Sequence, residues 1–226
     1  VAEKRLSAIR EFTELGSGYR IAMRDLEIRG AGNLLGERQS GHMEAVGYDL
    51  YCKMLNQAVM EAKGEKIQED FETSVDIDID AFIPSTYIKN EFQKLDMYKR
   101  IASIQNADEY GEMLDELIDR FGELPKPAAN LLLVALIRAE AHAAGVVQLV
   151  HKEKETRIYM HERADVDVAA IPDFLAEYGR RIQFKATAKN PYFLVNMNGF
   201  KGQGLLLEEK SLVENMLRIL CHKELN

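Results

Sequence analysis

The 226-residue chain has no tryptophan, two cysteines and five prolines, and it has no apolar run of the roughly 18 residues that a membrane span requires. Cys52 and Cys221 both lie in patterns typical of helices, which indicates reduced, packed thiols rather than a disulfide framework. No signal peptide opens the sequence. The sequence begins at Val1, without a methionine, inside what reads as a continuing helix. We therefore expect the chain to be a fragment of a longer cytoplasmic protein.

Positive charge is also scarce, with 29 Lys+Arg against 37 Asp+Glu and a net charge of −8 at pH 7. This balance disfavours sequence-independent DNA binding by the whole chain, because such binding depends on cations that neutralise phosphates. Residues 1–63 hold nine basic and nine acidic residues, so the net charge belongs to the remainder. We therefore assign any phosphate contact to residues 1–63 and expect a protein-binding surface in residues 64–226.

What the chain does have is a concentration of glycine, with seven of its fifteen glycines between Gly16 and Gly47. Helices are expected over residues 2–15, 17–29 and 49–63, from apolar spacings of three to four residues. The first two helices, with the glycine-rich exit loop, predict a helical hairpin that ends in a hook. The hairpin and hook glycines that permit its turns are Gly30, Gly32, Gly36 and Gly41.

Several site types are excluded by spacing. No strand precedes the glycines and no Gly-Lys-Ser/Thr follows them, so they do not form a phosphate loop. The alternating aspartates of residues 76–80 lack the glycine and glutamate of a calcium loop, since Ala81 and Tyr87 occupy those places. His42 and Glu44 have no third ligand nearby. We expect no catalytic residue, metal site or cofactor site in this chain.

Residues 64–75 are polar and acidic and predict a linker. Alternation of apolar and acidic residues from Val75 to Ala81 predicts a half-exposed strand, and Ser85 is expected to cap a helix that continues to about Ile101. Further helices are expected over 108–121, 127–144, 168–178 and 208–222, and strands over 146–150, 156–161, 181–186 and 191–197. Residues 76–226 are thus predicted to form a mixed α/β (α+β) domain, separate from the hairpin.

Two groups of polar residues are candidates for function. Arg29 and Gln39 flank a glycine turn, where they either satisfy backbone carbonyls or contact a phosphate or a neighbouring lobe. Glu116 and Asp119 are three residues apart and share a helix face. That face is either solvated surface or a docking site for arginines, and the residues alone leave both alternatives open.

The stretch LGSGYRIAMRDLEIRGAGNLLGERQSGHMEAVGYDLYCKMLNQAV resembles the translocation motif shared by RecG helicases and bacterial transcription-repair coupling factors. KLDMYKRIAS and ELIDRFGELPKPAANLL resemble the C-terminal domain of the coupling factors specifically. The resemblance covers essentially the whole chain. It implies that residues 1–63 are the end of a second RecA-like motor lobe with its translocation hairpin, and that residues 76–226 are a regulatory domain.

In that family the whole protein is an ATP-dependent double-stranded DNA translocase, which displaces stalled RNA polymerase and recruits nucleotide excision repair through UvrA. The resemblance implies that ATP and magnesium bind to parts of the parent outside this chain, so the chain alone is expected to be inactive. It places the residues that couple ATP hydrolysis to translocation on Arg5, Arg29 and Gln39. It also places an acidic pair on Glu116 and Asp119, which docks on the UvrB-like module of the same parent and hides the UvrA-binding surface.

Two other hypotheses remain at this point. The chain could be a non-catalytic interaction module in which the hairpin is only structural. It could also be a fragment of a RecG-type fork-regression helicase, although that family lacks the domain that contains ELIDRFG.

Overall fold

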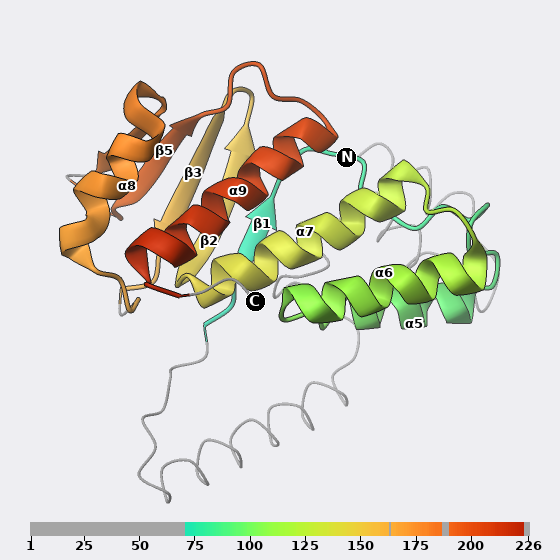
Figure 1. Ribbon diagram of the computed structural model, residues 1–226. Helices are drawn as coiled ribbons and strands as arrows, with labels where there is room; N and C mark the ends of the chain where they lie inside the picture. The colour runs from blue at the N-terminus through green and yellow to red at the C-terminus, as the bar shows by residue number, and fades with distance from the viewer. Residues whose placement is uncertain (1–70, 163, 187–189, 224–226) are drawn as a thin grey trace, which may run out of the picture.

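The computed structural model describes residues 71–162, 164–186 and 190–223 (Figure 1). The expected hairpin and the helix at 49–63 lie outside these residues. Within them the chain forms five α-helices and one five-stranded sheet, with two short 3-10 helices. The elements are β1 (Ser74–Asp76), α5 (Glu91–Ala102), α6 (Ala107–Phe121), α7 (Lys126–Ala143), β2 (Val146–Lys152), β3 (Glu155–Met160), η1 (Val168–Ala170), α8 (Ile171–Tyr178), η2 (Gly179–Arg181), β4 (Ile182–Lys185), β5 (Tyr192–Asn196) and α9 (Gln203–Leu220).

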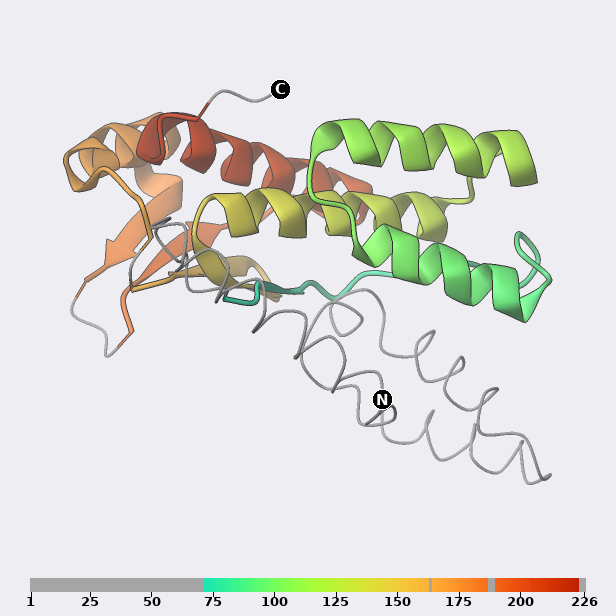
Figure 2. The same cartoon turned by 90° about the horizontal axis from the view of Figure 1, so that it is seen from below.

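The sheet is mixed, with strand order β1-β2-β3-β5-β4. Strand β1 is parallel to β2, and every other neighbouring pair is antiparallel. Helices α7, α8 and α9 pack on one face of the sheet, while α5 and α6 pack against α7 beyond the edge of the sheet (Figure 2). The α+β class expected for residues 76–226 is confirmed.

Helix α7 joins the two parts of the core. Residues 130–137 are buried without interruption, as expected for a helix that is covered on all sides. The predicted start near Pro127 is confirmed, since α7 begins at Lys126 and carries the proline in its first turn. The expected helix at 108–121 and the four strands after Gly145 are also found, with ends shifted by one or two residues.

Two local predictions were wrong. The strand expected over 75–81 ends at Asp76, because the chain then turns, with the Ile79 amide donating to the Ile77 carbonyl at 2.9 Å. The alternation of apolar and exposed acidic side chains nevertheless continues to Ala81, with Ile79 half-buried and the other apolar side chains buried. Ser85 does not cap α5. The cap is Asn90, whose side-chain Oδ1 accepts hydrogen bonds from the backbone amides of Phe92 and Gln93, at 3.0 Å each.

Two helices near the C-terminus also differ from expectation. The segment expected as one helix over 168–178 begins as the 3-10 turn η1, in which the Asp167 side chain accepts from the Ala169 amide at 2.9 Å. Helix α9 begins at Gln203, five residues before the expected start. Leu205 and Leu206 are buried in its added first turn, so packing extends this helix toward the N-terminus.

A polar network lies in the core beneath α9. His151 and Thr156 are cross-strand partners on β2 and β3, and the Thr156 hydroxyl donates to the Glu209 carboxyl group on α9. The His151 Nδ1 atom lies 3.0 Å from that hydroxyl. The Glu209 side chain is fully buried, and its Oε2 atom has no hydrogen-bond partner among the described residues. Burial raises the pKa of Glu209 to about 8.

We predict that Glu209→Gln reduces the loss of stability at alkaline pH. A folded-state pKa above the unfolded value means that the Glu209 contribution is fully present below about pH 4.5 and is lost as the pH rises through about 8. Chemical denaturation at pH 6 and pH 9 should show the free energy of unfolding falling less in the variant, by on the order of 2 kcal/mol. Burial also raises the pKa of Glu140 to about 7, but Glu140 contributes equally to the pH dependence of stability in both proteins. Equal losses in the variant and the wild type would contradict this account.

Candidate protein-docking site

Of the residues predicted to have functional roles, Glu116 and Asp119 lie in the described structure, both on α6. The predicted coupling residues Arg5, Arg29 and Gln39 lie outside the described residues. So do the predicted hairpin and hook glycines, Gly30, Gly32, Gly36 and Gly41.

Local sequence defines both ends of α6. The Asn106 side chain accepts from the Glu109 amide at 2.9 Å, and the Glu109 carboxylate accepts from the Gln105 amide at 2.9 Å. This reciprocal arrangement satisfies amides that a helix N-terminus leaves unpaired. Gly122 ends the helix with a φ of +86°, a backbone conformation that favours glycine.

Helix α6 buries Met113 and Leu117 and leaves a row of carboxylates outside. The Asp119 side chain is exposed, and no hydrogen bond or ion pair to it is found among the described residues. Ile118, beside it, is 43% exposed. The other exposed carboxylates of this helix are Asp108, Glu112 and Asp115. The outer face of α6 is therefore acidic, with the exposed apolar side chain of Ile118 next to Asp119 at its C-terminal end.

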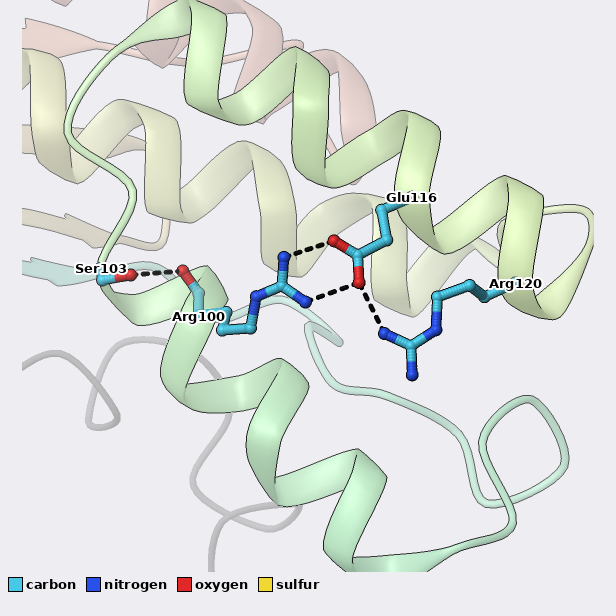
Figure 3. Close-up of polar contacts among 4 residues, drawn as sticks. All are labelled: Arg100, Ser103, Glu116 and Arg120. Carbon is cyan, nitrogen blue, oxygen red and sulfur yellow. Dashed lines mark hydrogen bonds and ion pairs between the residues drawn. The ribbon is translucent and has the colours of Figure 1, made fainter.

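Glu116 differs from Asp119 because it already has two partners (Figure 3). The Arg100 guanidinium, at the end of α5, donates to both carboxylate oxygens, with an Nη1–Oε1 distance of 2.6 Å. Arg120, one turn along α6, donates to Oε1 at 2.5 Å. The Glu116 side chain is 27% exposed and the two arginine side chains are 42% and 40% exposed. Glu116 thus joins α5 to α6 at the edge of the acidic face.

The hydrogen bonds from Arg100 and then Arg120 lower the pKa of Glu116 to about 2. Glu116 is therefore ionised throughout the physiological range, but its charge is balanced locally by two arginines. Asp119 and the exposed carboxylates beside it carry the uncompensated negative charge of the face. The sequence left a solvated face and a docking face open for this pair; in the structure Asp119 is exposed, whereas Glu116 is bound by two arginines.

Sequence reasoning missed Arg100. Arg120 follows Glu116 by four residues, a spacing that predicts contact on a helix. Arg100 belongs to the preceding helix, and its contact depends on how α5 and α6 cross, which the sequence pattern does not determine. The only available signal was its position in the last turn of a helix that a short loop connects to α6.

Comparison with known proteins shows the relationship of the chain. The TRCF domain family matches residues 77–171, which run from the residue after β1 to the first residue of α8 and include α6. The chain is 48% identical over 186 residues to the transcription-repair-coupling factor of Bacillus subtilis (strain 168), and this match covers 80% of the chain. The chain belongs to the transcription-repair-coupling factor family.

Further relatives agree with this assignment. The transcription-repair-coupling factor of Staphylococcus aureus (strain USA300) is 45% identical over 169 residues, or 74% of the chain. The chain spans only 16% of the length of the Bacillus relative and 14% of the Staphylococcus relative. The fold resembles a crystal structure of the C-terminal domain of a transcription-repair coupling factor, with a TM-score of 0.63 and 24% identity, over 70% of this chain and all of that one.

Other site types find no support in the described residues. No group of three or more His, Cys, Asp or Glu side chains in residues 71–162, 164–186 and 190–223 could hold a metal ion. In the same residues, no helix is long and apolar enough to cross a membrane.

We predict that the Glu116 ion pairs make the free energy of unfolding decrease at acidic pH. A lowered folded-state pKa gives stability that is present above about pH 4.5 and is lost as the pH falls toward about 2. Because the arginines are partly exposed, we expect a loss of about 1 kcal/mol between pH 5 and pH 2.5, measured by denaturant unfolding. Glu116→Gln should remove this component, and Arg100→Gln should remove more of it than Arg120→Gln. A Glu116→Gln variant with the wild-type acid dependence would refute the assignment.

Proposed function

We propose that the described domain is a regulatory docking module of a transcription-repair coupling factor. Its α6 face binds an arginine-bearing surface, the UvrB-like module of the same parent, and thereby hides the UvrA-binding surface. The observation that most supports this proposal is the row of exposed carboxylates on α6, with Asp119 unpaired among the described residues. Carboxylates and arginines form bidentate hydrogen bonds, which make such contacts specific in geometry.

The two acidic residues have different roles in this proposal. Asp119 presents a free carboxylate and the half-exposed Ile118 supplies an apolar contact beside it. Glu116 fixes α6 against α5 through Arg100, so the exposed row is held at a constant orientation. If the docking pairs are buried on contact, loss of one partner costs about 2–5 kcal/mol, whereas exposed pairs contribute about 0–1 kcal/mol.

For the whole protein we propose an ATP-dependent double-stranded DNA translocase that displaces stalled RNA polymerase and recruits nucleotide excision repair. The name and close similarity of the relatives support this, while the chain spans only a small part of their length. Residues 1–63 would contribute the translocation hairpin, with Arg5, Arg29 and Gln39 coupling ATP hydrolysis to movement. The nucleotide and its metal would bind to parts of the parent outside this chain.

Charge reversal on α6 tests the docking proposal. In the full-length parent, Asp119→Arg should repel the partner arginines and increase the affinity for UvrA, about tenfold or more if the pair is buried. Adding Glu116→Arg should increase the affinity further, but it also breaks the contact between α5 and α6. Asp119→Arg alone is therefore the decisive variant.

The matched control is Asp173→Arg, which reverses an exposed carboxylate in the first turn of α8. It should leave UvrA affinity unchanged, as measured by titration with the purified repair protein. Unchanged affinity in Asp119→Arg, with the fold intact by circular dichroism, would sink the docking proposal.

A separate experiment tests the coupling residues. Arg29→Ala or Gln39→Ala in the full-length parent should retain ATPase activity and lose most displacement of stalled polymerase. Arg24→Ala, from the same expected helix, serves as the control and should displace polymerase normally. Normal displacement by the Arg29 and Gln39 variants would show that the coupling assignment is wrong.

A further inference from the structure

The second face of the sheet carries an arrangement that the proposed docking function does not use. Helices α7, α8 and α9 cover one face, where Leu149, Ile158 and Phe193 are buried. Among the described residues, no helix packs on the opposite face. Its side chains can be assigned from the strand register, because successive residues of a strand point to opposite faces.

The register arranges these side chains in two rows that run across four strands, from β2 to β4. The first row is Gln148, Tyr159, Tyr192 and Lys185. The second row is Val150, Arg157, Leu194 and Gln183. The first row consists of aromatic, amide and cationic side chains, and the second of aliphatic, amide and cationic ones.

Two tyrosines lie side by side at the centre of this face. Tyr159 on β3 and Tyr192 on β5 are cross-strand partners, with ring centroids 5.2 Å apart. The Arg157 guanidinium carbon lies 5.8 Å from the centre of the Tyr192 ring, within the range of a cation–π contact. Neighbouring aromatic rings on an open sheet, next to a guanidinium, are the surface on which unpaired bases stack.

Charge is distributed unevenly on this face. The two rows hold Arg157 and Lys185 and no carboxylate, although the whole chain has a net charge of −8. The acidic residues of the face lie at its margins, with Asp76 on the edge strand β1 and Glu155 beside the β2–β3 turn. The Glu155 carboxylate lies 3.9 Å from the Arg157 guanidinium, so a phosphate that binds Arg157 would compete with this carboxylate.

A hollow of about 460 Å³ adjoins the tyrosines over β2 and β3. It is lined by Tyr159 and Arg157, by Lys152, whose ammonium group adds a further cation, and by the carboxylates of Glu153 and Glu155. Gln148 lies in the same hollow and offers an amide, which can both donate to and accept from a base edge.

From this placement we propose that the open face of the sheet binds single-stranded nucleic acid. Tyr159 and Tyr192 stack on successive bases, Arg157, Lys185 and Lys152 contact the phosphates, and the amides of the two rows meet the base edges. The contact is independent of α6 and of the docking proposed for it.

Fluorescence anisotropy with a labelled 15-nucleotide oligo(dT) tests this proposal on the 226-residue chain at low salt. We expect saturable binding, weakened about fivefold to a hundredfold by Tyr159→Ala or Tyr192→Ala, as for the loss of one stacked base. Phe at either position should retain binding, because the ring remains. Neutralisation of about three phosphates should give a slope near −2.1 for log affinity against log salt concentration.

Residues 1–63 carry arginines of their own, so binding alone does not establish the site. The decisive comparison is Arg157→Ala against Arg218→Ala, because Arg218 is equally exposed but lies on α9, on the helical side of the sheet. Arg157→Ala should weaken binding and Arg218→Ala should not. The proposal is overturned if the folded Tyr159, Tyr192 and Arg157 variants all bind oligo(dT) as the wild type does. A face that binds a protein instead of nucleic acid would give this same result. It is equally overturned if the 226-residue chain shows no saturable binding.

Discussion

The burial of α7 is the constraint on which the rest of the structure depends. This helix lies between the sheet and the α5–α6 pair, and twelve of its residues are buried. Its apolar surface is therefore removed from water on several sides at once, at roughly 25 cal/mol for each Å². Two of its polar side chains hold neighbouring segments as well. Asn130 donates to the Asp80 carbonyl at 2.9 Å, and Arg138 donates to the carbonyls of Ala102 and Ile104 at 2.8 and 3.2 Å.

These contacts explain how a surface helix can present charge in a fixed direction. Arg138 holds the chain where α5 ends, and Arg100 on α5 then binds Glu116 on α6. The orientation of the acidic row is thus set by a series of contacts that begins in the buried helix. Asp119, at the exposed end of this series, is free to bind a partner without disturbing the fold.

Much of the fold could be predicted from local sequence. The helix at 108–121, the start of α7 near Pro127, and the strands at the C-terminal end all followed from apolar periodicity. The prediction failed where tertiary contacts override local pattern. The alternation after Asp76 describes burial correctly, but the backbone turns away from the sheet. The early start of α9 depends on the burial of Leu205 and Leu206, which no capping residue indicates.

The candidate site shows the same division. Glu116 and Asp119 were chosen from the resemblance and from their spacing, and both lie on α6. The pairing of Glu116 with Arg100 needed the three-dimensional crossing of α5 and α6. Net charge alone assigned residues 64–226 to a protein-binding surface. Only the strand register reveals two rows that contain arginine and lysine without a carboxylate.

The central claim is that α6 docks through its free carboxylates on an arginine-bearing module. The most direct test is calorimetric titration of the isolated UvrB-like module with the 226-residue chain, at 50 mM and at 500 mM salt. The account predicts measurable binding at low salt that weakens at high salt, because partly exposed charges are screened. It also predicts that this binding is lost when Asp119 is replaced by arginine. Binding of equal strength by the wild type and by Asp119→Arg, or binding that does not respond to salt, would contradict it.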